Sequence, residues 1–182
     1  MNLAKVVVAK YTIFDTIVVV INRICIKKLE EWSNRPRRKP LVIRGARQVG
    51  KSFLVDHFAG QRFADNYIYL NLEKQKDLEL FEPEVSISDL MQRIELRLGK
   101  KISKESGLIF IDEIQNSSVA MNILRYFYEE LPELRVIAAG SLLEIKMEKE
   151  GFSFPVGRVE YLYMFPVGFE EFFRRYRRQC FS

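Results

Sequence analysis

Residues 45–52 form a segment whose residue types and spacing suit the binding of a phosphate chain. The segment reads Gly45-Ala46-Arg47-Gln48-Val49-Gly50-Lys51-Ser52. Glycine at both 45 and 50 lets the backbone curl, so that successive N–H groups can point at one anion. Lys51 can reach the β- and γ-phosphates of a nucleotide, and the hydroxyl of Ser52 can ligate Mg²⁺. The segment therefore has the composition of a P-loop.

The residues on either side of this segment place it at a strand-to-helix turn. Leu41-Val42-Ile43 is an apolar run that predicts a buried strand, and Phe53, Leu54, Val55 and Phe58 continue at helical spacing. A helix that starts at the loop adds the positive end of its dipole to the phosphate site. We predict that the nucleotide-binding residues run from Gly45 through Phe53. The alternative is an ordinary glycine-rich turn, which does not need this flanking pattern.

A second motif places two carboxylates at the end of an apolar strand. Leu108-Ile109-Phe110-Ile111 runs directly into Asp112 and Glu113, as expected of a buried parallel strand that ends at a site. We predict that Asp112 holds Mg²⁺ through water beside Ser52, and that Glu113 orients and polarises the attacking water. Adjacent residues of a strand point to opposite faces, so we expect the two carboxylates to have different roles. The alternative is a strand followed by a solvated acidic turn.

Strands and helices are expected to alternate along the chain. The hydrophobic pattern predicts strands at 41–44, 67–72, 108–113, 135–139 and 161–165, and helices at 24–32, 51–59, 88–98, 119–131 and 169–173. Alternation of this kind predicts an α/β fold with a parallel sheet covered on both faces. The stretch between Lys51 and Asp112 holds a helix, a strand and another helix. We therefore expect a three-layer P-loop NTPase fold with a five-stranded, mainly parallel sheet, of the additional-strand, catalytic-glutamate type.

Composition and charge limit the classes of function. The chain has 182 residues and 48% hydrophobic content, which is enough for one domain with a substantial core. Its net charge is +5, and the four arginines between Arg174 and Arg178 supply most of it. The rest of the chain therefore has no strong field for nucleic acid. Cys25 and Cys180 lie far apart, imply no disulfide framework and fit a reducing, cytoplasmic location.

The first 22 residues are apolar and β-branched, but they differ from a targeting or membrane segment. Lys10 and Asp15 interrupt the apolar runs, so the stretch is too short and too charged to span a membrane. No small-residue cleavage pattern follows it. We expect no membrane partner, and we interpret residues 1–23 as an atypical N-terminal extension.

Several ordered blocks of the sequence are similar to motifs of one known superfamily. Besides residues 45–52 they are Ile111-Asp112-Glu113-Ile114-Gln115, Ala139-Gly140-Ser141-Leu142-Leu143, Phe154-Pro155-Val156-Gly157-Arg158-Val159 and Phe165-Pro166-Val167-Gly168-Phe169-Glu170-Glu171-Phe172. On these blocks the chain resembles the AAA+ superfamily, and within it a prokaryotic ATPase family that is usually joined to a C-terminal domain of poorly defined function. The resemblance covers roughly residues 24–173.

The resemblance implies roles for two further residues. Ser141 would be a sensor at the tip of strand four, reporting on the γ-phosphate and the attacking water. Arg158 would stabilise transition-state charge, either in its own subunit or in a neighbouring one, which leaves a homo-oligomer open. The alternatives are a simple turn hydroxyl for Ser141 and a salt-bridged surface arginine for Arg158. The resemblance also implies adenine rather than guanine, and no Asn-Lys-x-Asp element lies between Ser52 and Phe173.

The resemblance also implies how the chain is divided and what it does. We expect an ATPase domain at 24–173 and a basic tail at 174–182, with the helical lid and C-terminal domain of the family missing. The implied function is an ATP-hydrolysing module, with ATP and Mg²⁺ as cofactors, that drives movement of an absent effector domain. Two alternatives are a nucleotide-dependent switch with negligible hydrolysis, and a nucleic-acid-associated ATPase. The last rests on the arginine tail and on analogy with AAA+ proteins.

Overall fold

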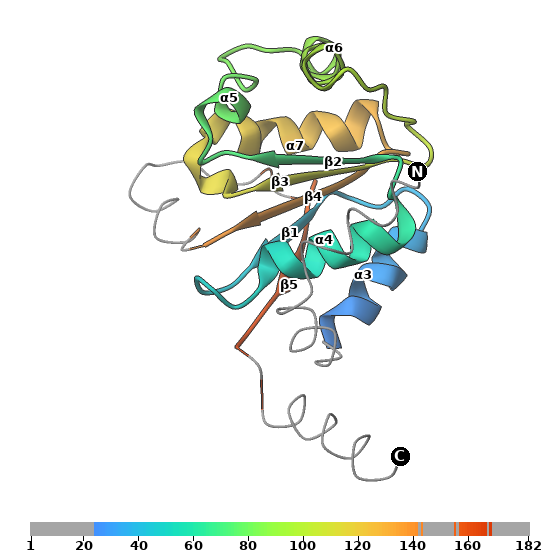
Figure 1. Ribbon diagram of the computed structural model, residues 1–182, viewed down its shortest axis with the longest axis vertical. Coiled ribbons are helices and arrows are strands. Elements are labelled where there is room, and N and C mark those ends of the chain that lie inside the picture. The colour runs from blue at the N-terminus through green and yellow to red at the C-terminus, as the bar shows by residue number, and fades with distance from the viewer. Residues whose placement is uncertain (1–23, 142, 144–154, 156, 167, 169–182) are drawn as a thin grey trace, which may run out of the picture.

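A single parallel sheet with helices on both faces organises the chain (Figure 1). The computed structural model describes residues 24–141, 143, 155, 157–166 and 168. Within them the strands are β1 (Leu41–Arg44), β2 (Tyr67–Asn71), β3 (Leu108–Asp112), β4 (Arg135–Gly140) and β5 (Glu160–Tyr163). The helices are α3 (Ile24–Asn34), α4 (Lys51–Arg62), α5 (Gln75–Leu78), α6 (Ile87–Leu98) and α7 (Ser118–Glu130), with the short 3₁₀ helix η1 (Ile114–Asn116). The expected three-layer α/β fold is confirmed.

The order of the strands is β2-β3-β4-β1-β5, and every pair of neighbours is parallel. Strand β4 therefore lies between the P-loop strand β1 and the carboxylate strand β3, which confirms the prediction of an additional strand. Arg44 is paired with Gly140, and Ile111 is paired with Ala138. Because parallel strands end at the same edge of a sheet, the segments that follow β1, β3 and β4 meet there.

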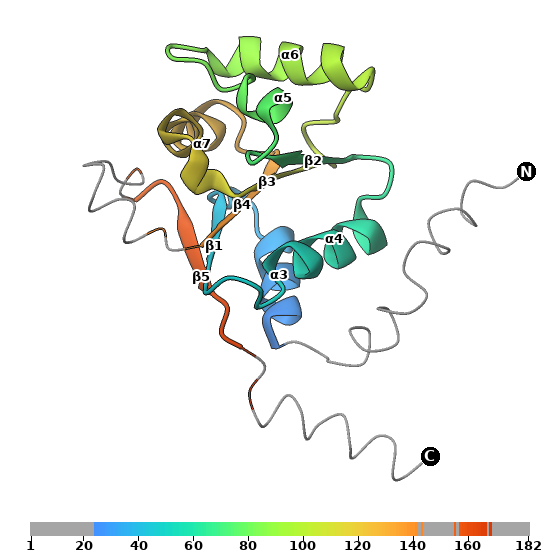
Figure 2. The same ribbon diagram turned by 60° about the vertical axis from the view of Figure 1, so that its left-hand side comes forward.

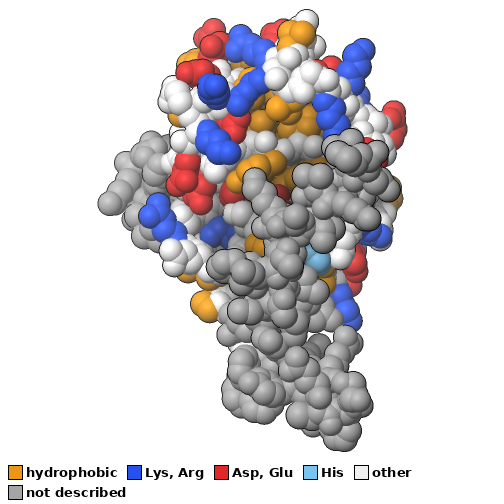
Figure 3. Space-filling view, viewed as in Figure 1, with side chains coloured by type: hydrophobic (Ala, Val, Ile, Leu, Met, Phe, Trp, Pro, Cys, Tyr) orange, Lys and Arg blue, Asp and Glu red, His pale blue; other side chains and the backbone are white. Residues whose placement is uncertain are grey.

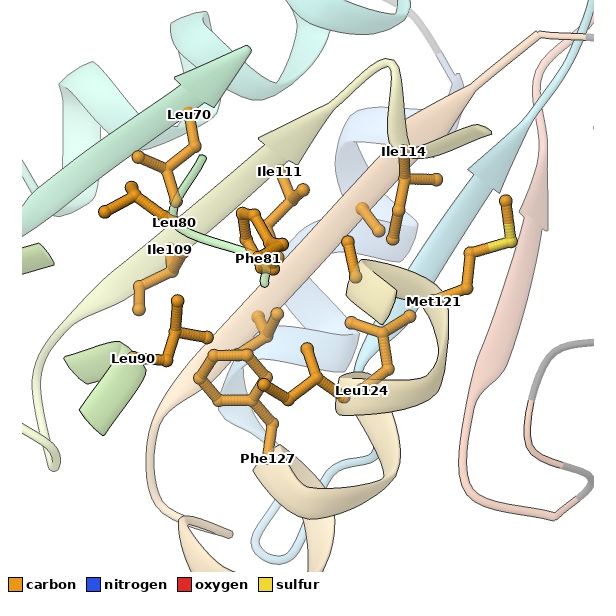
Figure 4. Close-up of a cluster of buried hydrophobic side chains, with 14 of the residues drawn as sticks. Leu70, Leu80, Phe81, Leu90, Ile109, Ile111, Ile114, Met121, Leu124 and Phe127 are labelled. Carbon is orange, nitrogen blue, oxygen red and sulfur yellow. The ribbon is translucent and has the colours of Figure 1, made fainter. Parts of the chain in front are cut away.

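Two hydrophobic clusters fill the spaces between the sheet and its helices. Helices α5, α6 and α7 lie on one side of the sheet, and α3 and α4 lie on the other (Figure 2). In the first cluster Leu90 of α6 and Phe127 of α7 pack with Ile109 of β3 (Figure 4). Phe110 belongs to the second cluster, on the α4 side. Side chains alternate between faces along a strand, so Asp112 also faces α4, the helix that begins at the P-loop.

The boundaries of most elements differ by a few residues from those expected, and two of these differences have a clear local cause. The fifth strand was expected at 161–165, whereas β5 spans Glu160–Tyr163, because its pairing with β1 stops where β1 gives way to the P-loop. Helix α6 begins one residue earlier than expected, at Ile87. The side chain of Ser86 accepts a hydrogen bond from the backbone N–H of Asp89 and so caps the helix. The four-residue helix α5 is too short to give a periodic signal.

Several of the expected segments fall outside the described residues. These are the N-terminal extension at 1–23, the closing helix at 169–173 and the basic tail at 174–182. The division into domains therefore stays a prediction.

The exit of β5 lies directly against the start of the P-loop. The backbone N–H of Met164 donates to the carbonyl of Arg44 over 2.7 Å. A methyl group added to Gly45 would lie 2.2 Å from the carbonyl oxygen of Met164, a distance that forces the backbone to move. Glycine is therefore required at position 45 by the close approach of a second strand, in addition to any contact with a ligand.

We predict that Gly45→Ala lowers the free energy of unfolding by about 1–3 kcal/mol, the usual cost of overpacking. Gly60→Ala is the matched control, because Gly60 lies in α4 and a methyl group there meets no atom within 4 Å. The control should gain about 0.4–1 kcal/mol through the lower entropy of the unfolded chain. Urea denaturation measures both, and equal effects of the two substitutions would contradict the account of Gly45.

Candidate functional site

The P-loop segment curls at the carboxyl end of β1 and leads into α4. Two of its residues have left-handed backbone angles, Gln48 with φ of 61° and Gly50 with φ of 90°. The left-handed angle at Gln48 could not be expected from the sequence, because non-glycine residues seldom adopt it. Gly50 is the N-cap of α4 and forms no side-chain cap. The loop therefore presents the backbone N–H groups at the start of a helix, as anion binding requires.

Lys51 is held on the inside of this loop. It is the first residue of α4, and only 6% of its surface is exposed. Its Nζ donates to the carbonyls of Gly45 over 3.0 Å and of Ala46 over 2.7 Å. Burial lowers the pKa of Lys51, while the nearby charges of Glu113 and Asp112 oppose that shift. The amine is thus enclosed by the loop and close to both predicted carboxylates, and it could exchange its carbonyl partners for phosphate oxygens.

Asp112 is buried, and several donors fix its carboxylate. Oδ1 accepts the backbone N–H of Glu113 over 3.0 Å, and Oδ2 accepts the hydroxyl of Tyr69 over 3.1 Å. Ser52 lies close enough to Asp112 for its side chain to act on the carboxylate. Burial raises the pKa of Asp112, and the side chain of Ser52, the backbone N–H of Glu113 and the hydroxyl of Tyr69 act in the opposite direction. The structure therefore brings together Ser52 and Asp112, the two residues predicted as metal ligands.

Glu113 lies in the turn that follows β3, and the backbone of this turn sets the direction of its side chain. Strand β3 ends at Asp112, and Glu113 has a left-handed φ of 53°. The expectation that Glu113 belongs to the strand was therefore wrong, and strand alternation does not set its direction. That the two carboxylates have different roles stays a prediction. Nε2 of Gln115 donates to Oε2 of Glu113.

Gln115 is also close to the end of β4. A methyl group added to Gly140 would lie 2.5 Å from Oε1 of Gln115, and Gln115 itself is buried. Gln115 thus lies between Glu113 and the carboxyl end of β4. Gln115 belongs to a sequence block that is similar to the AAA+ superfamily, but no function was assigned to it from the sequence.

Ser141 lies at the same edge of the sheet. It follows Gly140, the last residue of β4, and 2% of its surface is exposed. Since β4 lies between β1 and β3, Ser141 follows the strand that separates the P-loop from the carboxylates. This is the location expected for a residue that senses the γ-phosphate.

Arg158 lies at the opposite edge. It precedes β5 by two residues, and β5 runs parallel to β1, so it lies at the amino ends of the strands. Its Nε donates to Oε1 of Glu129 over 2.8 Å, and its guanidinium lies 5.9 Å from the ring of Tyr128. The structure thus does not bring Arg158 to the P-loop of its own chain, and it forms the surface salt bridge of the alternative interpretation. A role in a neighbouring subunit stays a prediction.

The described residues contain no group of three or more histidine, cysteine or acidic side chains that could hold a metal ion. Mg²⁺ does not need such a group, because it keeps several waters and is usually bound through one or two carboxylates together with phosphates. Ser52 and Asp112 fit that mode of binding. Among the same described residues, none of the helices is both long enough and apolar enough to cross a membrane.

The strand order, the P-loop after β1 and the carboxylates at the end of β3 define a P-loop NTPase fold. The family model described as "AAA domain" matches residues 37–173. The chain therefore belongs to this family of AAA-type P-loop ATPases. The match includes the P-loop, Asp112, Glu113, Ser141 and Arg158. No curated protein matches the chain.

We predict that Asp112→Asn stabilises the nucleotide-free protein, and that the gain grows as the pH rises above the ordinary carboxyl pKa of 3.8. The folded-state pKa of Asp112 is raised, so the folded protein loses stability as Asp112 ionises, and asparagine does not ionise. Urea denaturation of both proteins at about pH 4.5 and about pH 7.5 isolates this difference. A gain that stays constant or shrinks with pH would contradict the assignment.

Proposed function

We propose that this chain binds ATP with Mg²⁺ and hydrolyses it to drive a conformational change in an effector domain. The observation that carries the proposal is the buried Lys51 inside the P-loop, with Ser52 and the buried Asp112 close to each other beside it. A buried ammonium next to a curled backbone suits a chain of phosphates. Adenine as the base is proposed from the family to which the chain belongs.

Each residue at the carboxyl edge has a role in this proposal. The loop from Gly45 to Phe53 binds the phosphates through backbone N–H groups and through Lys51. Ser52 and Asp112 hold Mg²⁺, which neutralises charge on the phosphates when it is bound.

The other residues of the edge act on the water and on the γ-phosphate. Glu113 accepts a proton from the attacking water and orients it, and Ser141 donates its hydroxyl toward the γ-phosphate. Since Gln115 donates to Glu113, that hydrogen bond sets the starting position of the carboxylate.

A nucleotide-dependent switch with negligible hydrolysis is the second candidate function. The observation that favours it is the pairing of Arg158 with Glu129, away from the P-loop, which leaves the site without this arginine in its own chain. If Arg158 acts in a neighbouring subunit, phosphate release per subunit should rise with protein concentration. If the protein is a switch, release should stay negligible at every concentration.

A role on nucleic acid receives little support from the described surface. Figure 3 shows basic and acidic side chains interspersed over the described part of one face. Such a mixture does not produce the single-sign field that attracts a phosphate backbone. The arginine tail on which this role depends lies outside the described residues.

We predict that Lys51→Ala loses most of its affinity for ATP, because the substitution removes the one ammonium inside the described P-loop. Lys101→Ala is the matched control, since it removes the same charge from an exposed loop. Titration calorimetry with ATP and Mg²⁺ measures both. Unchanged affinity of Lys51→Ala would overturn the proposed nucleotide site.

We predict that Glu113→Gln keeps the affinity for ATP but slows hydrolysis by about 10²-fold or more, the scale typical of a lost acid–base group. Glutamine has nearly the same shape but does not accept the proton of water. Steady-state phosphate release measures the effect. Equal turnover in the two proteins would remove Glu113 from the mechanism.

A further inference from the structure

Two tyrosines of β2 face α4, and each donates its hydroxyl to a different carboxylate. Tyr67 donates to Oδ1 of Asp56, which lies in α4. Tyr69 donates to Oδ2 of Asp112 over 3.1 Å. The tyrosines are two residues apart on one strand and are both half-buried. Each hydroxyl therefore has a different carboxylate partner, which makes Tyr67 a suitable control for Tyr69.

The ring of Tyr69 is fixed by stacking. It lies on the ring of Phe110, with centroids 5.4 Å apart and planes inclined by 30°. Phe110 is paired with Tyr69 across the two strands and is two residues from Asp112, so it faces the same side of the sheet. Stacking of this kind directs the hydroxyl along β3 toward Asp112.

The other contacts of Asp112 show what this hydroxyl does. A carboxylate has about four acceptor positions. The backbone N–H of Glu113 donates to Oδ1, and the hydroxyl of Tyr69 donates to Oδ2. The side chain of Ser52 also lies close to the carboxylate. These groups come from three different elements, the turn after β3, β2 and α4. Together they leave the carboxylate little freedom to rotate, and acceptor positions remain for a water of the metal.

We propose that Tyr69 is a positioning residue for the Mg²⁺ site, whose hydroxyl holds Asp112 in the orientation that accepts a water of the metal. The proposal rests on the proposed function, because it assigns Mg²⁺ to Ser52 and Asp112. Groups that orient metal-binding side chains typically change metal affinity by about 10- to 100-fold when they are removed. The competing explanation is that Tyr69 only fills space beside Phe110, in which case its hydroxyl has no effect on the metal.

The test compares Tyr69→Phe with Tyr67→Phe in the full chain. Both substitutions remove one hydroxyl and keep the ring. The affinity for a non-hydrolysable ATP analogue is measured by calorimetry, once in EDTA and once with Mg²⁺. We expect both variants to match the wild type in EDTA. Mg²⁺ should raise the affinity of the wild type for the analogue by a certain factor. In Tyr69→Phe this factor should be roughly tenfold smaller, whereas in Tyr67→Phe it should equal that of the wild type.

A second measurement uses Mn²⁺ in place of Mg²⁺. Electron paramagnetic resonance counts the free Mn²⁺ in solutions of protein and analogue, and so gives the metal affinity without any hydrolysis. It should be weaker in Tyr69→Phe than in wild type and Tyr67→Phe. Urea midpoints of the two variants equal to that of the wild type will show that both retain the fold.

Three results would overturn the proposal. An unchanged metal gain in Tyr69→Phe would show that its hydroxyl does not act on the site. An equal loss in both variants would show a general effect of packing in β2. If the wild type binds the analogue no better than Lys51→Ala does, the proposed function itself fails, and the role of Tyr69 fails with it.

Discussion

The burial of two opposite charges at one edge of the sheet is the constraint on which the rest of the structure depends. Lys51 and Asp112 are both nearly inaccessible to solvent, and burial disfavours the charged form of each. An isolated buried charge is expensive, so each must have partners. Lys51 donates to two carbonyls of its own loop, and Asp112 accepts from Tyr69 of β2 and from the backbone N–H of Glu113. The local structure of the edge follows from the need to supply these partners.

The fold supplies them through the order of its strands. Because β4 separates β1 from β3, the P-loop and Asp112 are two strands apart, and the residues that follow β4 lie between them. Gln115 contacts Glu113 and lies against Gly140, so the side chain of Gln115 connects the carboxylate of Glu113 with the end of β4. On the other side of β1, the exit of β5 is bonded to Arg44 and lies against Gly45.

The sequence predicted the parts of this site that depend on local residue types. The P-loop, the strand before it, and Asp112 at the end of an apolar run all have signals within a few residues. The contacts of Tyr69 and Asp112 had no such signal, because these residues are 43 positions apart and meet only through the pairing of β2 with β3. The direction of Glu113 could not be predicted either, since it depends on a left-handed angle in the turn. The position of Arg158 could have been predicted from the sequence. A residue that precedes a parallel strand lies at the amino ends of the strands, which is the edge opposite the P-loop.

The most direct test of this account is a crystal structure of the chain with a non-hydrolysable ATP analogue and Mg²⁺. We predict that Nζ of Lys51 leaves the carbonyls of Gly45 and Ala46 for phosphate oxygens, and that the metal lies between Ser52 and Asp112. A nucleotide bound away from residues 45–52, or a Lys51 that still donates to both carbonyls beside a bound analogue, would contradict it.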